Sequence, residues 1–192
     1  MKSYREMPQG HRQILTIDLQ KNKKLALMVN GLALLIAAAM IAVALPLVPI
    51  GSIFVNDDLR GILIKLAVMY GGMFVYIILH EAVHGIVMRR FSDAKVRFGF
   101  TGLYAYAGSD AYYCRKHYII IALAPIVVWG VVLGILNVLV PEEWFYVVYM
   151  IQMTNVSGAA GDLYVSWKMS RLPADILVQD VGIAMTVYSA EV

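Results

Sequence analysis

The stretch ILIKLAVMYGGMFVYIILHEAVHGIVM, residues 62–88, decides the architecture of this chain and carries its most specific motif. Almost every residue in it is aliphatic, aromatic, methionine or glycine, which predicts a helix inside a membrane. Within it, His80-Glu81-Ala82-Val83-His84 places two imidazoles one turn apart on one helix face. That spacing suits two ligands of one zinc ion, with Glu81 beside them as general base. Ionisable groups at this depth cost roughly 2.5–3.5 kcal/mol each to insert, so they indicate a functional site.

The composition of the whole chain is typical of a membrane protein. It has 192 residues, of which 60% are hydrophobic and 15% charged, and its mean hydropathy is +0.70. Soluble domains average about 25% charged residues, and the repeated apolar runs leave no room for a separate soluble domain. The single cysteine, Cys114, excludes an internal disulfide. The first apolar run exceeds the roughly 7–15 residues of a signal-peptide core, so we expect an uncleaved span.

Apolar segments of membrane-spanning length recur along the chain. The sequence predicts an all-α multi-pass membrane protein with about four transmembrane helices and small β-like elements at the cytoplasmic side. The predicted spans cover residues 25–48, 62–88, 118–140 and 144–167. Between the second and third spans, residues 91–116 carry alternating aromatic residues and turn residues, which predicts one or two short strands.

The placement of basic residues predicts how the spans are oriented. With a cytoplasmic amino-terminus, 14 of the 16 Lys and Arg residues lie on the cytoplasmic side, while the outer loops carry acidic residues at 57–58 and 142–143. Under the positive-inside rule, this predicts a multi-pass protein of the cell membrane with both termini in the cytoplasm. The expected segments are a cytoplasmic N-terminal segment (1–24), a four-span metalloprotease-like core (25–171) and a cytoplasmic C-terminal tail (172–192).

A catalytic zinc site needs a third protein ligand at the depth of the two histidines. His80 and His84 precede the basic end of their span by between one and three turns, or roughly 6–13 Å. On the fourth predicted span, which runs in the same direction, Asp162 lies six residues before Lys168, or roughly 9 Å from the same boundary. The match in depth predicts Asp162 as the third ligand. The alternative is a helix-end residue that pairs with Lys168 or Arg171.

Small residues precede Asp162 in the run Asn155-Val156-Ser157-Gly158-Ala159-Ala160-Gly161. Such residues let two helices approach closely in a membrane, and a short aspartate needs that approach to reach a metal held by another helix. Asn155 lies about two turns deeper and is predicted to hydrogen-bond a substrate backbone or the water. An interhelical hydrogen bond is the other interpretation of Asn155. Asp110 is a fallback ligand, because its loop could fold back onto the site.

The two motifs together resemble those of a known enzyme class. His80-Glu81-x-x-His84, followed on a later span by Asn155-x-x-Gly158-x-x-Gly161-Asp162, is similar to the motif pair of site-2 protease-type intramembrane zinc metalloproteases. In that class the aspartate of the second motif is a metal ligand. This chain has glycines where the class usually has prolines, and no glycine after the aspartate. More closely, residues 15–190 resemble a zincin peptidase family of small bacterial membrane proteins, long classed as a domain of unknown function. That resemblance includes Gly161-Asp162-Leu163-Tyr164 and Arg171-Leu172-Pro173.

Motif, depth and resemblance lead to one functional hypothesis. We expect an intramembrane or membrane-proximal zinc metalloprotease that hydrolyses peptide bonds near the cytoplasmic leaflet, with Glu81 as general base. Zn²⁺ is expected on His80, His84 and Asp162, and the substrate on Asn155. The expected partners are the lipid bilayer and a membrane-protein or peptide substrate, and no nucleic acid. The same ligands would also accept Fe²⁺, Co²⁺ or Mn²⁺.

Other functions remain open alternatives. One is a metal transporter or sensor, although a carrier needs ligands for successive sites and this chain has only four histidines. Another is a non-catalytic scaffold in which the histidines form a buried polar network without metal.

Residues 96–113 allow two interpretations. In the first they form an interfacial loop anchored by tyrosines such as Tyr104 and Tyr106. In the second they form a membrane-dipping hairpin whose open edge pairs with an extended substrate, as proteolysis requires. The resemblance favours the second, because site-2 protease-like enzymes are thought to use such an edge.

Overall fold

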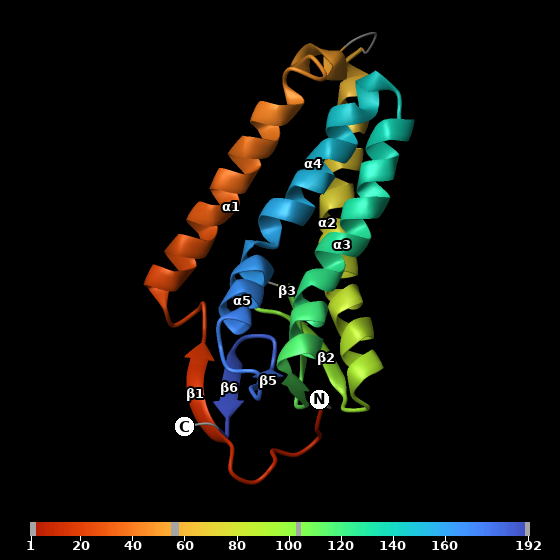
Figure 1. Cartoon of the computed structure of the whole chain (residues 1–192). Coiled ribbons are helices and arrows are strands. Elements are labelled where there is room, and N and C mark those ends of the chain that lie inside the picture. The colour runs from red at the N-terminus through yellow and green to blue at the C-terminus, as the bar shows by residue number, and fades with distance from the viewer. Residues whose placement is uncertain (1–2, 55–57, 103–104, 191–192) are drawn as a thin grey trace. The chain divides into compact units, whose positions relative to one another are not determined.

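A computed structural model shows a mostly helical protein with small strands. It describes residues 3–54, 58–102 and 105–190, so Asp57 of the predicted outer loop and Tyr104 of the predicted hairpin lie outside the described residues. In chain order the elements are β1 (Arg12–Ile17), α1 (Lys23–Ala44), the 3-10 helix η1 (Ile50–Phe54), α2 (Leu59–Phe91), β2 (Val96–Phe100), β3 (Ala105–Ser109), β4 (Tyr112–Cys114), α3 (Arg115–Leu139), α4 (Glu142–Gly158), α5 (Ala160–Ser170), β5 (Leu177–Asp180) and β6 (Met185–Ser189) (Figure 1).

Within the described residues, three helices, α1, α2 and α3, are long and apolar enough to cross a membrane. They begin and end within four residues of the first three predicted spans. Large apolar side chains on them are widely exposed, as at Leu34 (73%), Phe74 (67%) and Val138 (84%). Exposed apolar helix surface of this extent indicates contact with lipid. The mostly helical class and the membrane character of the chain are therefore supported.

The fourth predicted span, residues 144–167, is divided between two helices. α4 ends at Gly158 and α5 begins at Ala160, with Ala159 between them at φ −83° and ψ 17°. Glycine weakens a helix by roughly 1 kcal/mol relative to alanine, and glycines stand on both sides of this break, at 158 and 161. α4 has 17 residues and α5 has 11, fewer than α1, α2 or α3. The count of four transmembrane helices stays a prediction.

Strands from both ends of the chain meet in one antiparallel sheet of order β1-β6-β5-β4. In it Leu15 of β1 lies opposite Val187 of β6, and Val178 of β5 lies opposite Tyr113 of β4. Val178, Val187 and Tyr113 are fully buried, so the sheet is part of a packed core. The small strands agree with the predicted strands in 91–116. β5 and β6 lie in residues 172–192, where the sequence predicts only a tail.

The chain divides into two compact units. One comprises Met1–Val29, Glu81–Pro125 and Gly161–Val192 and contains both sheets; the other comprises Asn30–His80 and Ile126–Ala160 and is helical. The division falls inside the single helix α2, between His80 and Glu81.

A close helix contact fixes the packing within the helical unit. A Cβ on Gly72 of α2 would lie 2.5 Å from Cδ1 of Ile151 on α4, so the glycine lets the Ile151 side chain lie against the α2 backbone. One turn further along each helix, Tyr76 of α2 and Asn155 of α4 are in hydrogen-bond contact.

Candidate metal centre

His84 is held in one orientation by a backbone carbonyl. The residue is 8% exposed, and its Nδ1 lies 2.9 Å from the carbonyl oxygen of Ile121 on α3. Because a carbonyl only accepts, the neutral imidazole carries its proton on Nδ1 and donates it to Ile121. The lone pair is then on Nε2, which lies 3.6 Å from Oδ1 of Asp162 on α5. Metal-binding histidines typically have this arrangement, with one ring nitrogen on a hydrogen-bond acceptor and the other on the metal.

His80, one turn earlier on α2, is supported by side chains instead. It is 9% exposed, and its Nδ1 lies 2.6 Å from the hydroxyl oxygen of Tyr76. The Tyr76 hydroxyl donates in turn to Oδ1 of Asn155 at 2.9 Å. The rings of Tyr76 and His80 also contact edge to face, with centroids 5.7 Å apart. His80 is therefore fixed both by a hydrogen bond and by ring packing.

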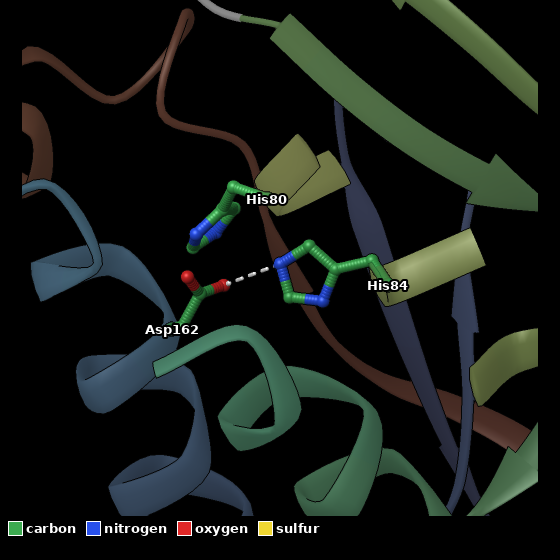
Figure 2. A group of neighbouring side chains, drawn as sticks. All are labelled: His80, His84 and Asp162. Carbon is green, nitrogen blue, oxygen red and sulfur yellow. Dashed lines mark ion pairs between the residues drawn. The ribbon is translucent and has the colours of Figure 1, made fainter. Parts of the chain in front are cut away.

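The three residues predicted as ligands lie together in the structure. One ligand atom from each of His80, His84 and Asp162 lies within 4.8 Å of the other two, and Figure 2 shows the three side chains turned toward one another. Zinc binds imidazole nitrogen and carboxylate oxygen at about 2.0–2.2 Å, so two ligands at a tetrahedral angle lie about 3.4 Å apart. The 3.6 Å between His84 and Asp162 is close to that spacing. The group could therefore bind a metal ion, and its two nitrogens and one oxygen fit zinc.

The break between α4 and α5 determines where Asp162 lies. Because α5 begins at Ala160, Asp162 is in the first turn of a helix. Negative charge is stabilised at a helix N-terminus, where backbone N–H groups have no partner within the helix. The side chain of Asp162 is 24% exposed, against 10% for that of His84, so the ligand group is not sealed within the protein.

Glu81 follows His80 directly on α2 and is half-buried. It is not part of the three-residue group found among the described residues. A general base must lie beside the metal without binding it, because a carboxylate that bound the metal would be less able to take up a proton. The geometry is compatible with the predicted role of Glu81, which stays a prediction.

Asn155, the predicted substrate contact, is fully buried. Its Oδ1 accepts the hydrogen bond from Tyr76, and its Nδ2 donates to the carbonyl of Ile126 on α3 at 3.4 Å. These are interhelical hydrogen bonds, the alternative that the sequence left open. Whether Asn155 also contacts a substrate stays a prediction.

Asp110, the fallback ligand, lies elsewhere. Its carboxylate forms an ion pair with Arg97 of β2, and it is outside the ligand group found among the described residues.

Two further acidic and phenolic groups lie near the ligands and were not singled out from the sequence. The Tyr118 hydroxyl of α3 donates to Oδ2 of Asp180 at 2.8 Å, and the Gly182 N–H donates to Oδ1 at 2.8 Å. Burial raises the pKa of the Asp180 carboxyl, the two hydrogen bonds oppose that rise, and the charge of Asp162 adds to it. Asp180 ends β5, which pairs with the neighbouring β6 and with the distant β4, and no local sequence signal distinguishes it from a solvated aspartate.

Comparison with known proteins identifies a family. No curated protein and no solved structure matches the chain. The model of the DUF3267 family, described as "Putative zincin peptidase", matches residues 73–177, more than half of the chain. The matched segment includes Tyr76, His80, Glu81, Asn155 and Asp162. The description implies a zinc-dependent peptidase, which agrees with a ligand group of two histidines and one aspartate. The chain therefore belongs to the putative zincin peptidase family.

Proposed function

We propose that this chain is a site-2 protease-like zinc metallopeptidase that cuts peptide bonds within or next to the membrane, near its cytoplasmic face. The observation that carries the proposal is the clustering of His80, His84 and Asp162, with Glu81 between the two histidines on an apolar helix of membrane-spanning length. Family membership supports peptidase chemistry. Ionisable groups are expensive in such a helix, so a functional role explains their presence better than packing does.

The chain supplies the remaining parts of a hydrolytic site. Zinc held by His80, His84 and Asp162 would lower the pKa of a coordinated water and polarise the substrate carbonyl. Glu81 accepts a proton from the attacking water and then donates it to the leaving amine. His84 keeps Nε2 directed at the site through its hydrogen bond to Ile121.

The proposed enzyme crosses the membrane four times, and the strand pairing supports this. β1 pairs with β6, and β4 pairs with β5. The segments before α1, between α2 and α3, and after α5 therefore lie on one side of the membrane. Since α3 leaves that side and β5 is back on it, α4 and α5 together make the return crossing as a broken helix. Such a break is tolerated at membrane depth when protein covers it, and Ala159 and Ala160 are each 1% exposed.

The side on which the strands lie is the cytoplasm in this proposal. The supporting observation is the concentration of Lys and Arg residues in the same three segments, since positive charge is retained on the cytoplasmic side. Both termini and the basic end of α2 at Arg89 and Arg90 are then cytoplasmic. The ligand group lies one to three turns from that end.

Removal of the metal tests the enzymatic proposal directly. The purified chain in detergent is expected to hydrolyse single-span membrane peptides, to lose that activity on treatment with a zinc chelator, and to regain it when zinc is added back. Peptide hydrolysis followed by mass spectrometry gives the measurement, and chelator presaturated with zinc gives the control. Hydrolysis that continues after elemental analysis shows the zinc to be gone would contradict the proposal.

The hairpin of β2 and β3 is the proposed substrate-binding edge. Among the described residues β2 pairs with one strand, β3, and Phe100 on it is 70% exposed. A Cβ on Gly85, the residue after His84, would overlap the ring of Phe98, so β2 packs directly against α2 beside a metal ligand. An extended peptide on the free edge of β2 would gain backbone hydrogen bonds next to the site.

Proline substitutions across Val96–Phe100 test this edge. At positions whose N–H faces the free edge, proline removes one hydrogen bond to the substrate, worth about 0.5–1.5 kcal/mol, so kcat/KM should fall roughly two- to twelvefold at unchanged zinc content. Arg97→Ala is the matched control for Arg97→Pro, because both lose the ion pair with Asp110 and only proline lacks the N–H. If every proline variant with normal zinc content cleaves at the wild-type rate, β2 does not bind substrate.

A further inference from the structure

A buried chain of hydrogen bonds ends on His80. It begins at the carbonyl of Ile126, which accepts from Nδ2 of Asn155, and continues from Oδ1 of Asn155 through the Tyr76 hydroxyl to Nδ1 of His80. Asn155 is 0% exposed, Tyr76 5% and His80 9%. All these residues belong to the helical unit.

The donor and the acceptor of each of these three hydrogen bonds follow from the chemistry of the groups. The Ile126 carbonyl only accepts, so Asn155 presents Nδ2 to it and Oδ1 to Tyr76. An amide oxygen also only accepts, so the single hydroxyl proton of Tyr76 goes to Asn155. The Tyr76 oxygen can then only accept from His80, which places the imidazole proton on Nδ1. Nε2 of His80 is left with the lone pair that a metal ion requires.

We infer that Tyr76 and Asn155 are positioning residues that hold His80 in its Nδ1–H tautomer and orient Nε2 toward the metal. The inference rests on the proposed metal site and deepens it, since it assigns each histidine its own support. His84 takes its tautomer from the Ile121 backbone carbonyl, which no side-chain substitution removes. His80 depends on two side chains from two helices.

Close helix packing explains how these hydrogen bonds can join residues of different helices. The contact of Gly72 with Ile151 brings α2 and α4 together one turn before Tyr76 and Asn155. The Trp129 ring of α3 packs edge-on to Tyr76, with centroids 6.4 Å apart and an interplanar angle of 84°. The Tyr76 ring is therefore held by edge contacts with Trp129 and His80 in addition to its hydrogen bonds.

Zinc affinity tests the inference with a readout other than activity. Zinc binding to the purified full-length chain in detergent is measured by competition with a chelator of known affinity, for wild type, Tyr76→Phe and Asn155→Leu. Loss of such a supporting partner typically weakens metal binding roughly 10- to 100-fold, and we expect both variants to fall in that range. Tyr146→Phe is the matched control: it also removes a buried tyrosine hydroxyl that donates a hydrogen bond, in this case to the backbone carbonyl of Val48, and should bind zinc as wild type does.

A second measurement does not depend on whether Tyr76→Phe or Asn155→Leu folds. Long-range ¹H–¹⁵N spectra of the metal-free wild type, with His80 assigned by its absence in His80→Gln, should show the proton on Nδ1. A proton on Nε2 would overturn the inference.

The outcomes separate this inference from the proposed function. Wild type that binds no zinc overturns the proposed function itself. Wild type that binds zinc, with both variants binding equally tightly, overturns only the positioning role. An Asn155→Leu variant with raised KM and unchanged zinc affinity also overturns it, and assigns Asn155 to substrate binding instead.

Discussion

Asp162→Ala should remove most of the zinc from the purified protein. The substitution takes away the single oxygen of the proposed ligand group and leaves His80 and His84, which alone do not complete the three-ligand set of a catalytic zinc site. Loss of a direct ligand should exceed the roughly 10- to 100-fold weakening caused by loss of a supporting residue. The measurement is zinc per chain by elemental analysis, with wild type at about one zinc and Asp162→Ala prepared in parallel.

Asp110→Ala is the control for this experiment. Asp110 is an aspartate between β3 and β4 that pairs with Arg97 and lies outside the ligand group, so its loss should leave the zinc content unchanged. Full zinc content in Asp162→Ala would show that Asp162 is not a ligand and that its pairing with His84 is structural. No metal in wild type, even after zinc is added, would make the histidines a buried polar network and favour a scaffold.

The part of the fold that follows from local composition could be predicted from the sequence. α2 extends three residues beyond each end of the predicted span 62–88, because a long apolar run has no competing structure in a membrane. The HExxH spacing likewise fixes His80 and His84 on one helix face whatever surrounds them. The proximity of Asp162 to the two histidines could be predicted, because depth along a helix follows from residue number alone.

The parts that depend on distant partners could not be predicted. β5 and β6 pair with each other locally, but Val178 and Val187 are buried in a sheet whose other strands, β4 and β1, are far away in the sequence. Asp180 lies at the end of β5, and it is therefore brought near Asp162 by that sheet rather than by its neighbours in the chain.

The sequence contains only partial signals for the helix break and for the residues that support His80. The glycines at 158 and 161 indicate a weak helix, but whether they allow close packing or end the helix depends on what covers Ala159. Tyr76 stands one turn before His80 on the same face, yet only the position of Asn155 on α4 determines which way its hydroxyl donates.

Glu81→Gln should abolish most turnover while the zinc content stays at the wild-type level. Glutamine has nearly the shape of glutamate but cannot accept the proton of the attacking water, and general base catalysis contributes about 10²- to 10⁴-fold to such reactions. Glu81 is outside the ligand group, so the substitution should leave metal binding unchanged. Rates of peptide cleavage and zinc per chain, measured on the same preparation, give both quantities.

His84→Ala is the contrasting variant, because it should lose zinc and turnover together. The comparison separates a base from a ligand: only a group that acts on the proton without holding the metal can remove activity at full zinc content. A metal carrier or sensor needs no proton acceptor beside its ligands, so Glu81→Gln would leave its metal binding and transport intact. Wild-type cleavage rates in Glu81→Gln would refute the mechanism even if the zinc site is real. Loss of cleavage at full zinc content would make the same variant suitable for retaining uncut substrates and identifying them.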